Sequence, residues 1–198
     1  MEKLFIPAKA KVALVPLFEK IKVQGYGVVT TVQHLDKLKK IDLKGNTFLG
    51  QVLGCNVKVA KGFPGYIFVG SGKFHAIQIA RGTGKKVILA NPFTLEVKEL
   101  TDEVEKIEKR VKGAYLKYLN AKKIGILVSV KPGQKYMQGK PDIENSYTFV
   151  CDNVAGLENF SDIDIFVNTA CPRLAYEGEF EKTVINWVDL KNLLVHQH

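Results

Sequence analysis

Short apolar segments alternate with longer, charged amphipathic segments along the whole chain. This alternation is typical of α/β proteins, in which the apolar segments form a mostly parallel sheet and amphipathic helices cover it. The apolar segments predict strands at residues 4–7, 27–31, 48–54, 65–69, 86–90, 124–130, 147–151 and 163–168, and the amphipathic segments predict helices at 13–24, 33–40, 75–83 and 102–120.

The alternation starts again after the long helix predicted at 102–120, so we place a domain boundary near residue 121. Residues 1–120 and 121–198 are then expected to form two similar α/β domains with mostly parallel sheets, packed around a shared cleft. The two halves share a strand–loop–helix rhythm but no strong residue repeat.

The composition supports a soluble globular protein. Hydrophobic residues make up 46% of the 198 residues, which is ample for a core, and no run of about 18 apolar residues exists to span a membrane. The formal net charge of +9 fits an acidic protein partner or an anionic small molecule. A basic patch interleaved with aromatic residues is not evident, so direct nucleic-acid binding is not expected. With only three cysteines and no signal peptide evident, the chain is expected to be cytoplasmic.

Two cysteines stand in short motifs that follow predicted strands. Cys55 follows the strand at 48–54, and Cys171 follows the strand at 163–168. Ligand sites of open α/β sheets lie at such carboxyl ends, but neither cysteine has a second cysteine at metal-site spacing. Taken alone, Cys55 also fits a buried small residue, and Cys151 is expected to be a core residue.

A glycine-rich turn, Gly70-Ser71-Gly72, follows the predicted strand at 65–69 and precedes a helix. Such a turn exposes backbone amides at the positive end of a helix, where phosphates, nucleosides or carboxylates bind. It matches neither the dinucleotide fingerprint nor the Walker pattern. His75, close behind, could contact a ligand, carry a proton or cap the helix start.

The second half offers two further candidate ligand contacts. Gln134 ends a Lys-Pro-Gly-Gln loop and could hydrogen-bond a ligand or stabilise its own turn. Arg173 lies two residues after Cys171, and its planar guanidinium suits a carboxylate.

Together these motifs resemble those of the diphthamide synthase family, the 2-(3-amino-3-carboxypropyl)histidine synthases of archaeal type. They occur in the family's order and span most of the chain. The matching segments are GQVLGCN at 50–56, FVGSGKFH at 68–75, NPFT at 91–94, GILVSVKPGQ at 125–134 and TACPR at 169–173.

The resemblance implies a radical enzyme with three α/β domains, each of which gives one cysteine to a 4Fe-4S cluster. Such an enzyme transfers the 3-amino-3-carboxypropyl group of S-adenosylmethionine to a histidine of elongation factor 2. Cys55 and Cys171 resemble the ligands of the second and third domains. Gly70, Ser71, Gly72, His75, Gln134 and Arg173 resemble contacts for S-adenosylmethionine.

The chain departs from the family pattern in lacking most of the first domain and its cysteine. We therefore expect a separate first-domain polypeptide to supply the third cysteine, together with a dimeric assembly and an external reductant. Two alternatives stay open. One is a non-catalytic supporting subunit or degenerate paralogue of the same family, and the other is a nucleoside- or phosphate-binding α/β module.

Overall fold

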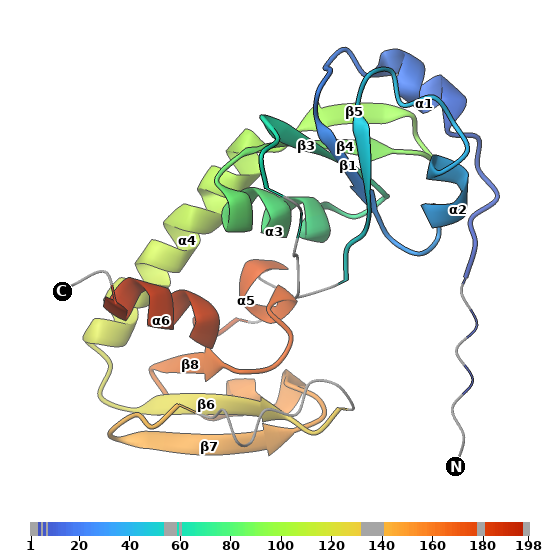
Figure 1. Cartoon of the computed structure of the whole chain (residues 1–198). Helices are drawn as coiled ribbons and strands as arrows, with labels where there is room; N and C mark the ends of the chain where they lie inside the picture. The colour runs from blue at the N-terminus through green and yellow to red at the C-terminus, as the bar shows by residue number, and fades with distance from the viewer. Residues whose placement is uncertain are drawn as a thin grey trace. The chain divides into compact units, whose positions relative to one another are not determined.

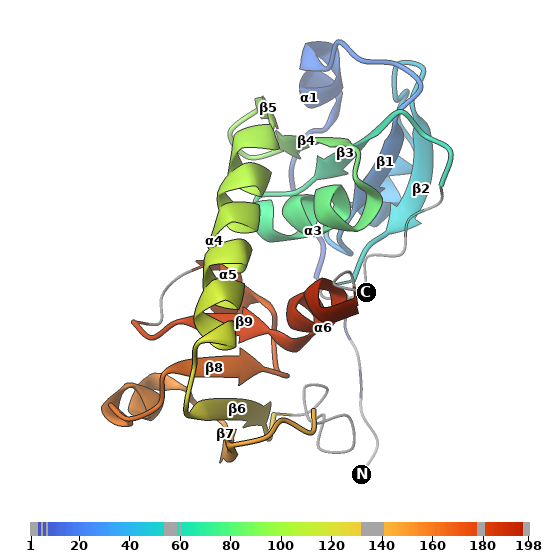
Figure 2. The ribbon, with the colours of Figure 1, turned by 90° about the vertical axis from the view of Figure 1, so that its left-hand side faces the viewer.

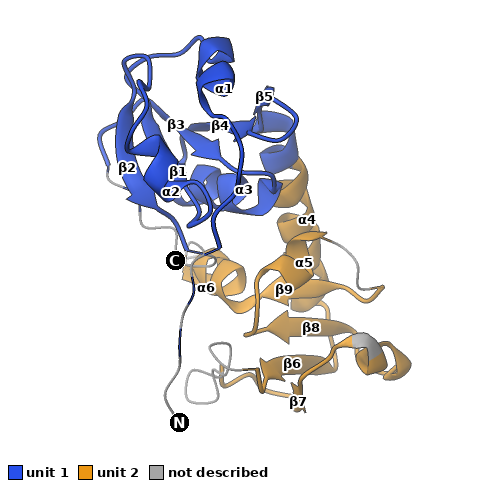
Figure 3. Ribbon diagram, turned by 90° about the vertical axis from the view of Figure 1, so that its right-hand side faces the viewer, with its two compact units in different colours: residues 1–105 blue, residues 106–198 orange. Residues whose placement is uncertain are grey.

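The computed structural model of the chain describes residues 4, 6, 8–53, 59, 61–131, 141–177 and 181–195. The chain divides into two compact units, residues 1–105 and 106–198 (Figures 1 and 3). The division falls inside the long helix α4 (Thr101–Leu119), earlier in the chain than the boundary expected near residue 121. The assignment of residues 1–120 and 121–198 to two domains of the family stays a prediction.

The first unit contains a five-stranded sheet. In spatial order its strands are β2 (Thr47–Gln51), β1 (Gly27–Thr30), β3 (Gly65–Val69), β4 (Lys86–Asn91) and β5 (Glu96–Glu99). The first four strands pair in parallel, and β5 runs antiparallel to β4 at the edge. Every residue of β1 and β3 is buried, which explains why these central strands read as continuous apolar runs.

Helices cover both faces of this sheet (Figures 1 and 2). Helix α1 (Val15–Lys20) and the short α2 (Leu35–Leu38) share one core cluster with Val28 and Ile67, which pair across β1 and β3. Phe68 is the next residue on β3, so its side chain lies on the opposite face. There its ring stacks on His75 of helix α3 (Lys73–Thr83).

The second unit contains a four-stranded, fully parallel sheet. Its spatial order is β7 (Ser146–Cys151), β6 (Ile124–Ser129), β8 (Ile165–Asn168) and β9 (Val184–Asn186). The part of α4 within this unit and helix α6 (Trp187–Val195) pack on one face, where Tyr115 and Leu190 join the core. On the other face Phe149 and Phe166 meet edge to face, with ring centroids 5.4 Å apart. Two short elements complete the unit, the 3-10 helix η1 (Ala155–Asn159) and helix α5 (Arg173–Glu177).

The four parallel strands of each unit follow one spatial order: second, first, third, fourth. In both units the chain therefore reverses direction across the sheet between the first and third strands, which is where open α/β sheets form ligand crevices. The prediction of a mixed α/β fold with mostly parallel sheets is confirmed. The shared cleft stays a prediction.

Several details differ from the sequence-based expectation. Leu4 and Ile6, from the strand predicted at 4–7, are exposed and lie outside any strand. Strands β5 and β9 and helices α5 and α6 were not predicted. In the described part of the chain, no helix is long and apolar enough to cross a membrane.

Candidate functional site

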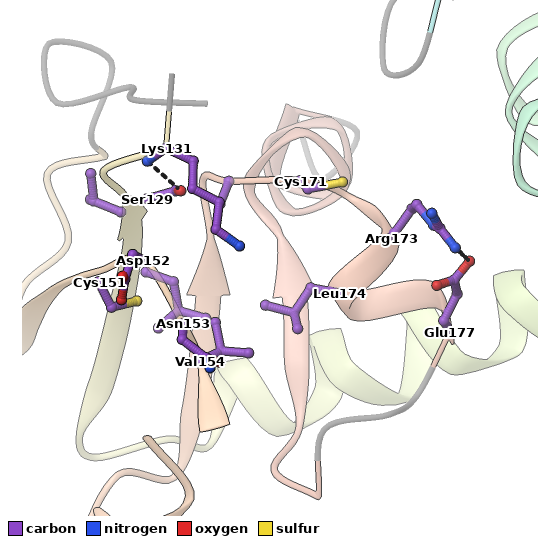
Figure 4. A pocket seen from close by; sticks show the side chains of 13 residues that line it. Ser129, Lys131, Cys151, Asp152, Asn153, Val154, Cys171, Arg173, Leu174 and Glu177 are labelled. Atoms are coloured by element: carbon purple, nitrogen blue, oxygen red, sulfur yellow. Dashed lines mark hydrogen bonds and ion pairs between the residues drawn. The ribbon is translucent and has the colours of Figure 1, made fainter. Parts of the chain in front are cut away.

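A cavity of about 380 Å³ opens at the carboxyl edge of the second unit's sheet (Figure 4). Its walls come from the ends of three neighbouring strands. Ser129 and Lys131 come from the end of β6, Cys151 and Asp152 from the end of β7, and Cys171 from the loop after β8. The cavity therefore lies where β6 and β8 meet, at the position that the strand order predicts for a ligand.

Cys171 sits in a tight turn that hydrogen bonds hold to the sheet. Thr169 donates from both its backbone nitrogen (3.0 Å) and its Oγ1 (2.7 Å) to the carbonyl of Leu127 on β6. Asn168 closes the turn on itself, because its Oδ1 accepts from the Ala170 nitrogen at 2.9 Å and its Nδ2 donates to the Cys171 carbonyl at 2.9 Å. The Cys171 thiol is free of any disulfide and partly exposed at the cavity.

A buried polar network supports this turn from behind. Asn168 and Asn186 lie opposite each other at the ends of β8 and β9, and Asn168 Nδ2 donates to Asn186 Oδ1 at 2.8 Å. Asn186 Nδ2 donates in turn to the Pro172 carbonyl and to Asp189 Oδ2, both at 3.2 Å. Tyr176 of α5 donates its hydroxyl to the same Asp189 oxygen at 2.6 Å. All four side-chain members are buried, so the network joins α5, β8, β9 and α6.

Arg173, the first residue of α5, also lines the cavity. Its guanidinium pairs with Glu177 one turn later, with Nε 2.8 Å and Nη2 2.7 Å from Oε1 (Figure 4). In this structure Arg173 thus binds a carboxylate of its own helix. A ligand carboxylate would have to share the guanidinium with Glu177.

Charges of both signs surround the cavity. Lys131 and Arg173 are cationic, and Asp152 and Glu177 are anionic. The backbone nitrogen of Lys131 donates to Ser129 Oγ at 3.1 Å, which fixes the start of the loop that leaves β6. A soft thiol beside paired opposite charges suits a ligand with both an ammonium and a carboxylate group.

Cys151 was expected in the core, but it lies partly exposed at the end of β7 and lines the same cavity as Cys171. The reason is that β7 is an edge strand, so its side chains are less enclosed than those of β6. Burial is the main cause that raises the pKa of the Cys151 thiol, and neighbouring Asp152 adds to it, while Lys131 opposes them.

The glycine-rich turn of the first unit leads from β3 into α3. Gly70 is buried, and a side chain there would collide with Phe68 at 2.7 Å. Gly72 is the N-cap residue of α3 and faces open space, as does the exposed Ser71 beside it. His75 is the third residue of the helix, with its ring centroid 5.4 Å from that of Phe68. The helix-cap interpretation of His75 is therefore wrong, since Gly72 takes that position.

An ionic cluster fixes the start of α3. Glu103 of α4 accepts from Lys98 at 2.6 Å and from Lys73, the first residue of α3, at 3.2 Å. The hydrogen bond from Lys98 is the main cause that lowers the pKa of Glu103 to about 2, and the bond from Lys73 contributes. The cluster therefore anchors the helix end that carries the glycine-rich turn.

Two predicted site residues, Cys55 and Gln134, lie outside the described residues. Among the residues that are described, no group of three or more His, Cys, Asp or Glu side chains could hold a metal ion. Of the two predicted metal ligands, only Cys171 lies among the described residues, where it lines the cavity. Its role as a cluster ligand stays a prediction. The roles of Gly70, Ser71, Gly72, His75 and Arg173 stay predictions.

Sequence reasoning missed the residues that hold Cys171 from behind, above all Asn186 and Asp189. The available signal was the asparagine at the end of a strand: Asn168 directly precedes Thr169-Ala170-Cys171. A buried asparagine requires partners for its amide. Those partners come from β9 and α6, which the sequence pattern did not predict.

The whole chain is similar to known proteins of one kind. A family model described as "Putative diphthamide synthesis protein" matches residues 1–198. A 2-(3-amino-3-carboxypropyl)histidine synthase of Pyrococcus horikoshii is 30% identical, over 96% of this chain and 65% of that protein. A protein of the same name from Methanocaldococcus jannaschii is 30% identical over 76% of this chain and 45% of its own length. The chain thus spans less than two thirds of either relative.

Solved structures agree with these matches. The crystal structure of Dph2 from Pyrococcus horikoshii superposes with a TM-score of 0.80 at 28% sequence identity, and covers 96% of this chain and 65% of that one. A crystal structure of the same protein with a 4Fe-4S cluster gives a TM-score of 0.79 with the same identity and coverage.

Proposed function

The chain belongs to the diphthamide synthesis protein family, and from this we propose that it forms the C-terminal part, or a subunit, of a 2-(3-amino-3-carboxypropyl)histidine synthase. In this proposal it transfers the 3-amino-3-carboxypropyl group of S-adenosylmethionine to a histidine of elongation factor 2. That transfer is the first step of diphthamide biosynthesis.

The observation that carries the proposal is the position of Cys171. Its thiol lines a cavity at the carboxyl edge of a sheet, in a chain that superposes on a Dph2 structure containing a 4Fe-4S cluster. We propose Cys171 and Cys55 as two cluster ligands, with the third thiolate supplied by a separate polypeptide. Three protein thiolates would leave one iron open for the substrate.

The side chains around Cys171 can bind the amino-acid end of S-adenosylmethionine. Arg173 and Lys131 offer cations to its carboxylate, and Asp152 offers oxygens to its ammonium group. The Gly70-Ser71-Gly72 turn, His75 and Gln134 are proposed as further contacts. When bound, the 4Fe-4S cluster supplies the electron that cleaves S-adenosylmethionine into a 3-amino-3-carboxypropyl radical.

The net transfer is balanced without consuming an electron. The bond between the sulfonium sulfur and the aminocarboxypropyl carbon breaks, and methylthioadenosine leaves. A carbon–carbon bond forms at the imidazole carbon between the two ring nitrogens, and that carbon loses its proton together with one electron, which replaces the electron supplied for the cleavage. An external reductant is needed only to bring the cluster to its reduced state.

The protein partners follow from the same proposal. Elongation factor 2 is the protein substrate, and a dimeric assembly holds the complete set of cysteines. The net charge of +9 suits docking on an acidic patch of the translation factor. Such binding weakens as salt is added, because screening acts on exposed charges.

Anaerobic reconstitution with iron and sulfide tests the proposal. Iron per chain, absorption near ~400 nm and release of methylthioadenosine are measured with and without a first-domain polypeptide. We expect a stable cluster and product only when both polypeptides are present. Full cluster loading and activity by this chain alone would overturn the split arrangement, and a colourless complex would overturn the cluster assignment.

A non-catalytic supporting subunit is the second candidate. Like the first candidate, it requires no three-ligand metal group within this chain, and the described residues contain none. The two candidates predict different results when modification of elongation factor 2 is measured. A complex that binds the cluster but modifies elongation factor 2 only when a separate catalytic sister chain is added supports the second candidate.

A further inference from the structure

We propose that Asn186 and Asp189 are positioning residues for Cys171, acting through the buried polar network behind its turn. Neither side chain lines the cavity. Both act through hydrogen bonds that fix the backbone on each side of the thiol. The inference rests on the proposed function in one respect, that Cys171 serves as a cluster ligand.

The network holds two consecutive carbonyl groups. Asn168 Nδ2 binds the carbonyl of Cys171 at 2.9 Å, and Asn186 Nδ2 binds the carbonyl of Pro172 at 3.2 Å. Because both carbonyls are held toward the buried side, the peptide from Cys171 to Pro172 and the peptide from Pro172 to Arg173 each have one orientation. The direction of the Cys171 side chain at the cavity is thereby set.

The hydrogen bonds also have a defined direction, and Asp189 sets it. Its Oδ2 can only accept, so it requires a donor from Asn186. That choice leaves Asn186 Oδ1 as the acceptor for Asn168. Asn168 must then present its Nδ2 to the Cys171 carbonyl and its Oδ1 to the Ala170 nitrogen. One carboxylate thus orients two amides and, through them, the turn.

Tyr176 links this network to the cavity wall. It donates to Asp189 from α5, the helix that starts at Arg173. Arg110 of α4 holds the Tyr176 carbonyl at 2.6 Å. The helix that carries Arg173 is therefore held by the same carboxylate that orients the Cys171 turn.

The test separates positioning from plain stability by reversing one hydrogen bond. Asn186→Asp keeps the shape but removes both donated bonds. The double variant Asn186→Asp with Asp189→Asn restores the bond between positions 186 and 189 with the opposite direction, yet still cannot donate to the Pro172 carbonyl. Thr30→Val is the matched control, since it removes a buried 2.7 Å bond to the Val69 carbonyl in the first unit.

The first readout is the rate at which Cys171 is alkylated in the full chain. Mass spectrometry of the peptide that contains Cys171 gives this rate, and the melting temperature of each variant is measured in parallel. We expect Asn186→Asp to raise that rate about tenfold, since the bond to the Pro172 carbonyl and the bond that ties Asn186 to Asp189 are both lost. The double variant should regain stability but keep the raised rate. Thr30→Val should lose stability and keep the wild-type rate.

The second readout is the half-life of the cluster in the reconstituted two-polypeptide complex. Asn186→Asp should shorten it about 10- to 100-fold, the effect typical of residues that orient a metal ligand. If the wild-type complex holds no cluster, the proposed function fails while the alkylation series still decides the positioning role. If the alkylation rate of Cys171 returns to the wild-type value in the double variant as its stability returns, the inference is overturned. If Asn186→Asp does not fold, Tyr176→Phe replaces it, and an unchanged Cys171 rate there overturns the inference equally.

Discussion

Cys151 and Cys171 line the same cavity from the two strands that flank β6. Cys151 ends β7, and Cys171 follows β8 in a turn whose carbonyls are held from behind. Burial, as the main cause, and Asp152 raise the pKa of the Cys151 thiol. One cavity therefore contains a thiol in a family motif and a second thiol outside any family motif.

This difference predicts opposite outcomes for two matched substitutions. Cys171→Ala should remove most of the iron and the absorption near ~400 nm from the reconstituted complex, because a cluster ligand is lost. Cys151→Ala should leave both unchanged, since Cys151 is not among the proposed cluster ligands. Iron analysis and the visible spectrum of both complexes check this. Equal iron in the two variants contradicts the assignment of Cys171.

The pairing of Arg173 with Glu177 predicts that Glu177 competes with a ligand carboxylate. Glu177→Gln should bind S-adenosylmethionine more tightly, by a few fold at most because the pair is largely exposed. Arg173→Lys should weaken binding about tenfold or more through loss of a charged, two-pronged contact. Equilibrium dialysis measures both affinities.

Methylthioadenosine provides the control ligand for these two variants, because it lacks the carboxylate. Its affinity should not change in either variant. If Arg173→Lys weakens both ligands equally, Arg173 does not bind the carboxylate.

The cluster of Glu103 with Lys98 and Lys73 predicts a loss of stability in acid. The pKa of Glu103 is lowered to about 2 from 4.5. The stabilisation is thus complete above pH 4.5 and is lost as the pH falls toward 2. A shift of this size corresponds to roughly 3 kcal/mol, but the half-exposed lysines are screened by water, so we expect about 1 kcal/mol.

Glu103→Gln tests this expectation. At pH 7 it should lower the melting temperature by about 2–4 °C, whereas near pH 2 the variant and the wild type should melt alike. Calorimetry at the two pH values gives the comparison. An equal difference at both pH values means that packing, and not charge, explains the effect.

Gly125 on β6 predicts a steric limit where β6 packs against two aromatic rings of the second unit. A side-chain carbon there would lie 2.4 Å from the Phe166 ring and 3.1 Å from Phe149. Gly125→Ala should therefore cost about 1–3 kcal/mol of the free energy of unfolding. Gly113→Ala, on an open part of α4, should instead stabilise by about 0.5–1 kcal/mol. Urea unfolding of both variants measures the difference, and similar values contradict the packing described.

The sequence predicted the central strands and the edge strands β2 and β7, but missed β5 and β9 at the opposite edges. β3 lies at the residues expected, 65–69, because a strand buried on both faces is a continuous apolar run. β5 contains a single apolar residue, Val97, and its position depends on pairing with β4 at the sheet edge. β9 has only three residues, too few for a period to be read.

The dependence of some elements on strand pairing also decided which site residues could be predicted from the sequence. Cys171 and Arg173 stand in one contiguous motif, so both were found from the sequence. The role of Asn186 depends on its register opposite Asn168 in an unpredicted strand. Cys151 was misjudged for a related reason, since its exposure follows from β7 lying at the edge rather than from its apolar neighbours.

The shared strand order of the two units makes the glycine-rich turn after β3 and the cysteine turn after β8 counterparts in one architecture. In the loop after the third strand, the first unit presents backbone peptide groups and the second unit presents a cysteine sulfur. The two units therefore share a strand framework and differ in the residues that they present at this strand exit. Exchanging those short turns between the units is accordingly a natural route for redesigning either half.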